Sequence, residues 1–175
     1  GVLHDCTHAG LSVGEDGETH QERNYLNLPL DNTQVWMPAD SNQAAAAAER
    51  GMEMIADGSK SVYVFFARSG HDQLKTPKGD VIYGKEYAFD GKIDLIRGNG
   101  NITDDVTIIA AGIPVHDAVA AADALAADLN RQLTVRVLNV GGRRKRRVTN
   151  ESERPRRGPR VHSAVRDERS DATRR

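Results

Sequence analysis

Short apolar runs recur along the first 140 residues, and each predicts a buried strand. These runs lie at residues 33–37, 61–67, 105–112 and 134–140, and residues 2–5 read as the end of a further strand. The run at 61–67 is almost continuously apolar, which is typical of a central parallel strand covered on both faces.

Two alanine-rich stretches lie between these runs and predict helices. One begins at Asp40 or Ser41, either of which can cap it, and ends before Gly58. The other covers about residues 115–129 and links the last two predicted strands in a β-α-β unit, which must be parallel with a right-handed crossover. The fold class is therefore expected to be α/β, with parallel sheet segments flanked by helices.

The pattern weakens between the two α/β segments. Residues 73–104 carry glycines, prolines and scattered charges, which predicts a linker with short strands at about 86–89 and 92–97. The chain also opens at Gly1 directly on a strand, so we expect an upstream part to be missing.

The net charge of −1 hides two regions of opposite sign. Residues 141–175 hold 13 Lys or Arg against 5 Asp or Glu, so this tail carries +8 and the preceding residues −9. Because the tail has almost no apolar residues to bury, we expect it to be disordered or a frame-shifted, non-native extension. It could attract nucleic acid by charge, but it lacks the interleaved aromatic residues that stack on bases, so we expect no such partner.

Composition excludes two classes of protein. The longest apolar stretches are about 6 to 8 residues, against the roughly 20 that cross a bilayer, and no signal-peptide pattern opens the chain. The single cysteine, Cys6, cannot form an internal disulfide, which agrees with a reducing compartment. We therefore expect a cytoplasmic protein with no membrane partner.

The densest group of chemically active side chains lies in the glycine-rich loop at residues 6–24. It holds His8 and His20 with the adjacent acids Glu15 and Asp16. Glycine lets a substrate approach the backbone, and histidine exchanges protons near neutral pH. On pattern alone, a polar surface loop explains the segment equally well. A metal site is a further alternative, with His4, Asp5, Cys6, His8 and His20 as ligands, although their spacing matches no standard closed zinc pattern.

This loop resembles the transketolase signature, which commonly reads T-H-D-S-x-G-x-G-E-D-G-P-T-H-Q. Here Thr7-His8 is followed at residues 14–21 by G-E-D-G-E-T-H-Q. Three further landmarks keep the family's order: a strand before an alanine-rich helix, a strand ending in arginine, and the strand that opens the C-terminal domain. They lie at residues 35–42, 62–68 and 105–112. The similarity covers about residues 2–140, and on it the chain is identified as a transketolase-family fragment.

The resemblance implies a domain plan and a set of partners. Residues 1–72 would be part of the pyrimidine-binding domain, 73–104 the linker, 105–140 the start of the C-terminal domain, and 141–175 the tail. Thiamine diphosphate would be the cofactor, with its divalent metal, Mg²⁺, held by a separate N-terminal domain or subunit whose G-D-G motif is not found here. The enzyme would be a homodimer that transfers a two-carbon ketol unit between sugar phosphates, and the isolated chain would be inactive.

Four residues take roles from the resemblance. His8 and Arg68 match a pair that holds the substrate phosphate, an oxyanion that the planar guanidinium suits. Asp16 matches an acid that contacts a substrate hydroxyl. His20 matches a catalytic histidine that faces the reactive end of thiamine diphosphate, where it can assist proton transfer. We expect the four side chains to converge on one cleft at the carboxyl edge of a parallel sheet.

The sequence departs from the family pattern at three places, none of which removes a residue with a proposed catalytic role. Glu18 replaces the usual proline, and Met37 replaces an arginine. Ala9-Gly10 replaces the common D-S pair, as it does in split transketolases and in deoxyxylulose-phosphate synthases. A deoxyxylulose-phosphate-synthase-like thiamine enzyme therefore stays open as an alternative.

Overall fold

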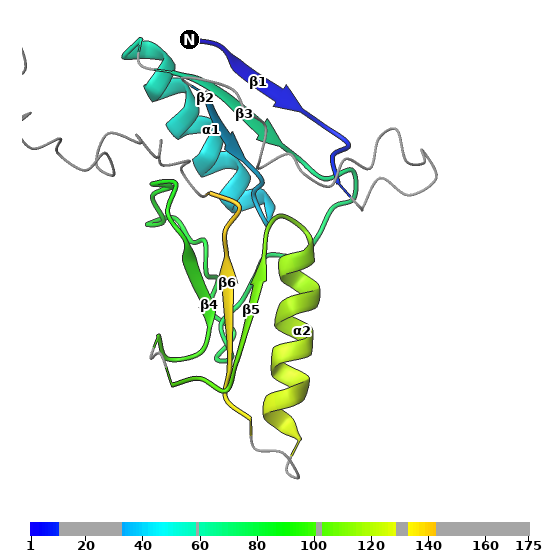
Figure 1. Ribbon diagram of the computed structural model, residues 1–175. Coiled ribbons are helices and arrows are strands. Elements are labelled where there is room, and N and C mark those ends of the chain that lie inside the picture. Colours follow the sequence, from blue (N-terminus) through cyan, green and yellow to red (C-terminus); the bar gives the residue numbers. More distant parts are fainter. Residues whose placement is uncertain (11–32, 59, 101–102, 129–132, 143–175) are drawn as a thin grey trace, which may run out of the picture. The chain divides into compact units, whose positions relative to one another are not determined.

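The computed structural model describes residues 1–10, 33–58, 60–100, 103–128 and 133–142 (Figure 1). All of them belong to the first of two compact units, Gly1–Lys145. The elements described are β1 (Leu3–Cys6), β2 (Thr33–Trp36), α1 (Ser41–Ala56), β3 (Ser61–Phe65), β4 (Asp94–Arg97), β5 (Val106–Ala110), α2 (Pro114–Ala127) and β6 (Val135–Asn139).

The first sheet has the strand order β1-β3-β2, and both strand pairs are parallel. β3 therefore takes the central position that its apolar run predicted. One face of the sheet packs against α1 through Val62, Val64 and Trp36, which are at most 2% exposed and contact Ala47 of the helix. The opposite face carries Val35, Tyr63 and Phe65, which alternate along β2 and β3 with the residues that face α1.

Helix α1 begins and ends where its sequence predicted. Asp40 is the N-cap residue, with extended backbone angles, and its Oδ1 accepts a hydrogen bond from Gln43 N at 2.9 Å. After Ala56 the chain reaches Gly58 at φ +68°, a conformation that glycine adopts readily and that stops the helix.

The second sheet has the order β4-β6-β5. β5 and β6 are parallel, as the β-α-β prediction required, but β4 is antiparallel to β6, so this sheet is mixed. β4 lies within the strand predicted at 92–97. The strand predicted at 86–89 is wrong, because the segment is irregular there: Tyr87 is half-buried where its hydroxyl reaches Asp94, and Phe89 packs edge-on against Trp36.

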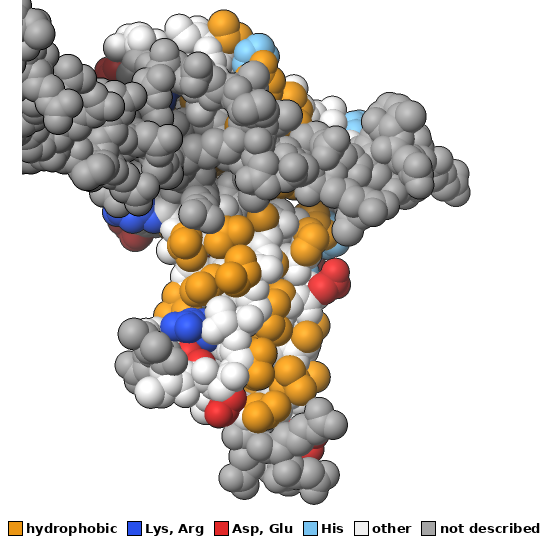
Figure 2. All heavy atoms as spheres, in the orientation of Figure 1, with side chains coloured by type: hydrophobic (Ala, Val, Ile, Leu, Met, Phe, Trp, Pro, Cys, Tyr) orange, Lys and Arg blue, Asp and Glu red, His pale blue; other side chains and the backbone are white. Residues whose placement is uncertain are grey.

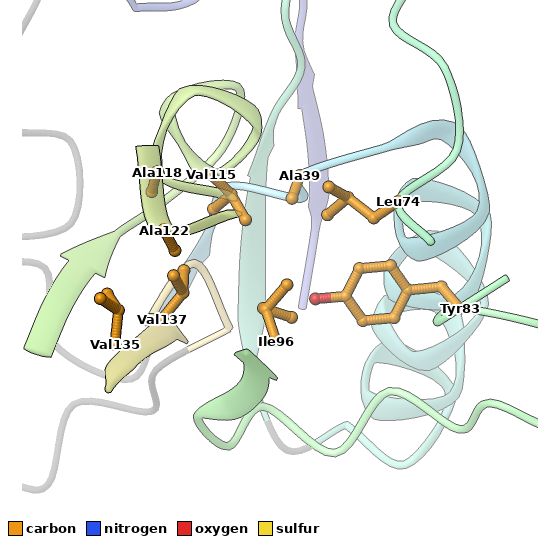
Figure 3. Packing of buried hydrophobic residues seen from close by; sticks show 9 residues of the cluster. All are labelled: Ala39, Leu74, Tyr83, Ile96, Val115, Ala118, Ala122, Val135 and Val137. Carbon is orange, nitrogen blue, oxygen red and sulfur yellow. The ribbon is translucent and has the colours of Figure 1, made fainter. Parts of the chain in front are cut away.

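The largest apolar cluster of the described residues packs against the second sheet and extends from α2 to the connection that follows β3 (Figure 3). Its side chains come from α2, from β4 and β6, from the connection after β3 and from the turn before α1. They are Ala39, Leu74, Tyr83, Ile96, Val115, Ala118, Ala122, Val135 and Val137. Since Leu74, Tyr83 and Ile96 lie within residues 73–104, this connection supplies part of the core.

The other face of the second sheet carries an apolar row. Leu138 of β6 pairs with Leu95 of β4 on one side and with Ile109 of β5 on the other. Leu95 is 44% exposed and Ile109 is 64% exposed. Figure 2 shows apolar side chains gathered over this part of the surface.

Neither helix in the described ranges is long and apolar enough to cross a membrane. The arginine-rich tail from residue 143 onward lies outside the described residues. The expectations for that tail, and the domain boundaries, stay predictions.

Candidate functional site

The exits of β1 and β3 lie side by side at the carboxyl edge of the first sheet. These two strands are adjacent and parallel, with Cys6 paired to Phe65 at their ends. Beyond the strands, Phe66 N donates to Cys6 O and Ala9 N donates to Phe66 O, both at 2.9 Å. His8 lies between Cys6 and Ala9, and Arg68 lies two residues after Phe66. The structure therefore brings two of the four predicted site residues to one edge.

His8 occupies a backbone conformation that is unusual for its residue type. Its φ of +58° lies in the left-handed region, and among the described residues it is the one non-glycine with a positive φ. Its side chain is exposed, with Nδ1 3.1 Å from Thr7 Oγ1. Such a conformation costs about 1–2 kcal/mol, and it lets Ala9 N turn back to reach Phe66 O. The fold therefore stabilises a strained residue at a position where the sequence predicts a substrate contact.

Arg68 lies in an exposed loop that we call the Arg68 loop, residues 66–74. The loop is anchored at its far end, where Leu74 N donates to Asp40 Oδ2 at 2.9 Å and Gln73 Nε2 donates to Asn42 Oδ1 at 3.1 Å. Asp40 is therefore both the cap of α1 and an anchor of this loop, since each carboxylate oxygen accepts one backbone N–H.

Two of the four predicted site residues lie in the part of the chain that the structure describes. His8 and Arg68 share the edge described above. Asp16 and His20 lie outside the described residues, so their positions and the roles of all four stay predictions.

The described part of the chain does not support the alternative metal site, because no three His, Cys, Asp or Glu side chains there lie close enough together to hold a metal ion. His4 stacks instead on Tyr63, with ring centroids 4.0 Å apart. Burial raises the pKa of the Cys6 thiol, and the Asp5 charge raises it further, which disfavours a thiolate ligand. Among the described residues, no group of side chains therefore fits a divalent cation.

Sequence analysis missed a buried polar cluster centred on Asp94. Asp94 Oδ2 accepts hydrogen bonds from Gln43 Nε2 at 2.8 Å, from Tyr87 Oη at 3.1 Å and from Tyr83 Oη at 3.2 Å. Burial raises the pKa of the Asp94 carboxyl. Burial also raises the pKa values of Tyr83 and Tyr87, so both phenols keep the protons that they donate.

Gln43 and Asn139 complete this cluster, and both are fully buried. Asn139 Nδ2 donates to Gln43 Oε1 at 3.0 Å and to Tyr83 Oη at 2.8 Å. Gln43 Oε1 also accepts from Ala39 N, and Asn139 Oδ1 accepts from Gly141 N. Because these amides satisfy one another, the cluster has the character of a structural joint between α1 and β6.

Backbone hydrogen bonds reinforce the joint. Met37 N donates to Gly141 O at 2.7 Å, and Gly112 N donates to Met37 O at 3.1 Å. The exits of β5 and β6 are thus bonded to the end of β2. No local sequence signal could reveal the contact between Asn139 and Gln43, because these residues lie 96 positions apart in the sequence.

Comparison with known proteins finds a match for the segment that carries His8 and Arg68. A family model described as "Transketolase, pyrimidine binding domain" matches residues 2–71. Transketolase 1 of Saccharomyces cerevisiae is 33% identical over 143 residues, covering 79% of this chain and 18% of the yeast protein. Transketolase-like protein 2 of Bos taurus is 32% identical over 121 residues, covering 68% of this chain and 17% of the bovine protein.

Solved structures of transketolases are also similar to this chain. A Pichia stipitis transketolase in complex with sedoheptulose 7-phosphate superposes with a TM-score of 0.56 at 28% identity, covering 77% of this chain and 18% of that one. A split-gene transketolase, described as an inactive beta4 tetramer, gives a TM-score of 0.55 at 28% identity, covering 81% and 39%.

The chain belongs to the transketolase family. Both His8 and Arg68 fall inside the segment that the family model matches. The chain spans about a fifth of the length of the curated transketolases that it matches. Transketolase membership implies thiamine diphosphate as the cofactor.

Proposed function

We propose that this chain is part of a transketolase-like transferase that moves a two-carbon ketol unit between sugar phosphates, using thiamine diphosphate. The observation that carries the proposal is the pair of Phe66 hydrogen bonds, which hold the exits bearing His8 and Arg68 together within the matched segment. Parallel α/β sheets bind ligands outside the carboxyl ends of their strands, which is where both residues lie.

Arg68 and His8 would bind the substrate phosphate. A guanidinium is permanently charged and presents paired donors that match phosphate oxygens, while an imidazole adds one more donor. The Pichia stipitis complex with sedoheptulose 7-phosphate supports a sugar phosphate as substrate. Asp16 would accept a hydrogen bond from a substrate hydroxyl, and His20 would transfer a proton at a substrate oxygen beside the cofactor.

The remaining parts of the site would come from elsewhere in the enzyme. From the resemblance to transketolases, we assign Mg²⁺ and the cofactor diphosphate to an N-terminal domain or subunit. We assign residues 1–72 to the pyrimidine-binding domain and residues 105–140 to the C-terminal domain, in a cytoplasmic homodimer. This chain would then form one wall of the site and be inactive alone.

The relatives reported above are transketolases or transketolase-like proteins, which favours ketol transfer over the deoxyxylulose-phosphate-synthase-like alternative. The two reactions differ in their donor, because the first takes the two-carbon unit from a ketose phosphate, whereas the second takes it from a 2-oxo acid that loses CO₂; both add it to an aldehyde phosphate. A product assay that supplies either a ketose phosphate or a 2-oxo acid as the donor, with the same aldose phosphate as acceptor, separates them.

The test is complementation. The full chain is mixed with a separately expressed yeast Transketolase 1 fragment that supplies the remaining segments, and ketol transfer is measured with thiamine diphosphate and Mg²⁺. We expect activity from the mixture and none from either part. A stoichiometric complex, seen by sedimentation, that shows no ketol transfer would contradict the proposal.

A further inference from the structure

A ring contact ties the middle of the Arg68 loop to α2. Its two ends are anchored by the backbone of Phe66 and by the Asp40 carboxylate. Between these anchors His71 is exposed, and Gly70 has open space around its Cα, with no atom within 4 Å of an added Cβ. The His71 ring lies 5.0 Å from the His116 ring, tilted by 31°.

His116 lies in the first turn of α2, well beyond the segment that the family model matches. Its Nε2 is 2.9 Å from Ala39 O. A carbonyl oxygen only accepts hydrogen bonds, so Nε2 carries a proton and donates. One half-buried imidazole thus contacts two segments of the first α/β part: the turn before α1, and the loop that carries Arg68.

We propose that His116 is a positioning residue for substrate phosphate, acting through His71 on the Arg68 loop. The inference deepens the proposed function and rests on it, because it takes Arg68 as the phosphate ligand. Its physical basis is pre-organisation: a loop already held in its binding geometry loses less conformational entropy when the phosphate arrives. The part of the chain after residue 71 would then contribute to phosphate affinity without touching the phosphate.

The test separates loop order from phosphate binding in the full chain. His116→Gln keeps a donor for Ala39 O but removes the ring that contacts His71. His71→Ala removes the other ring, and because His71 is exposed, this second variant is expected to fold. Asp72→Ala is the control, since the described part of the chain gives this neighbouring exposed side chain no hydrogen bond or ion pair. Backbone ¹⁵N relaxation reports order in residues 69–73, and titration with inorganic phosphate reports affinity.

In the wild-type chain we expect loop order parameters near those of rigid backbone, and in both histidine variants values below roughly 0.6. Phosphate affinity should weaken roughly three- to tenfold in the same two variants. Unchanged loop order and affinity in both would overturn the inference, as would an equal effect from Asp72→Ala.

Arg68→Ala distinguishes this inference from the proposed function. It should abolish the phosphate response while leaving the ring contact between His71 and His116 in place. If Arg68→Ala still binds phosphate normally, the phosphate role of Arg68 fails. The positioning role of His116 fails with it, even where the histidine variants disorder the loop.

Discussion

The two sheets use their carboxyl edges in opposite ways. At the first sheet, the exits of β1 and β3 bond to each other and leave His8 and Arg68 exposed. At the second sheet, the exits of β5 and β6 are occupied by the protein itself: Gly112 and Gly141 bond to Met37, and Asn139 bonds to Gln43. The same parallel arrangement therefore presents chemical groups at one edge and closes a structural joint at the other.

A site can form at the carboxyl edge of a parallel sheet. Whether it does depends on whether the polar side chains there already have hydrogen-bond partners within the protein. Gln43 and Asn139 are fully buried, and each of their polar atoms has a partner. A satisfied buried network stabilises one arrangement and offers no group to a ligand. His8 has the opposite character, since it is exposed and held at positive φ.

The largest effect is expected from breaking the joint. Gln43→Leu leaves Ala39 N without its acceptor and deprives Asp94 and Asn139 of one partner each. We expect a loss of about 3 kcal/mol in the free energy of unfolding, measured by urea titration. Gln73→Leu is the matched control, because Gln73 is exposed and loses only its exposed hydrogen bond to Asn42, and it should cost less than about 1 kcal/mol. Equal costs would show that the joint is not the stabilising feature.

The second effect is a pH dependence that marks the joint. Burial raises the pKa of Asp94 above its ordinary value of 3.8, so the folded protein holds this proton more tightly than the unfolded chain. The contribution of Asp94 to stability is therefore largest at acid pH, and it falls as the pH rises from 3.8 through the raised value. We expect the difference in unfolding free energy between wild type and Asp94→Asn to fall across that window.

Asp105→Asn is the control of opposite sign. Thr134 donates to Asp105 Oδ2 from its backbone N and from its hydroxyl, both at 2.9 Å, and these bonds lower the pKa of this carboxyl. Its stability contribution is present above 3.8 and is lost as the pH falls through the lowered value. If the difference in unfolding free energy from wild type changed with pH in the same direction for Asp94→Asn and Asp105→Asn, the opposite pKa shifts assigned to the two carboxyls would be contradicted.

The smallest effect concerns the outer face of the second sheet. Ile109 is 64% exposed, whereas its neighbour Ile108 packs against the core cluster on the other face. Ile109→Thr should change the free energy of unfolding by less than about 0.5 kcal/mol, and Ile108→Thr should cost about 1–2 kcal/mol. Light scattering should also show less self-association for Ile109→Thr, because the substitution interrupts the row with Leu95 and Leu138. Equal destabilisation by the two substitutions would contradict the assignment of faces.

Most of the fold could be predicted because its signals are local. The apolar run around Val62 and Val64 and the alanine-rich sequence of α1 act over a few residues, and Asp40 and Gly58 mark the helix ends as expected. The false strand at 86–89 arose because Tyr87, Ala88 and Phe89 form a short apolar run between two acids, while tertiary partners hold Tyr87 and Phe89 in an irregular segment.

The candidate site could be predicted less completely than the fold. His8 and Arg68 were found through the order of family landmarks, and the placement of both at one edge follows from the parallel pairing of β1 with β3. The contacts of His116 with Ala39 and His71 could not be foreseen from the sequence. Such contacts join segments far apart in sequence, so periodicity carries no trace of them.

The central claim is that the edge bearing His8 and Arg68 receives the substrate phosphate. The direct measurement compares kcat/KM for a phosphorylated and an unphosphorylated aldose acceptor, in the complemented enzyme with and without Arg68→Ala. Loss of a charge-assisted phosphate contact should lower kcat/KM for the phosphorylated acceptor by roughly 30- to 100-fold and leave the other almost unchanged. An equal loss for both acceptors would show that this edge does not bind the phosphate.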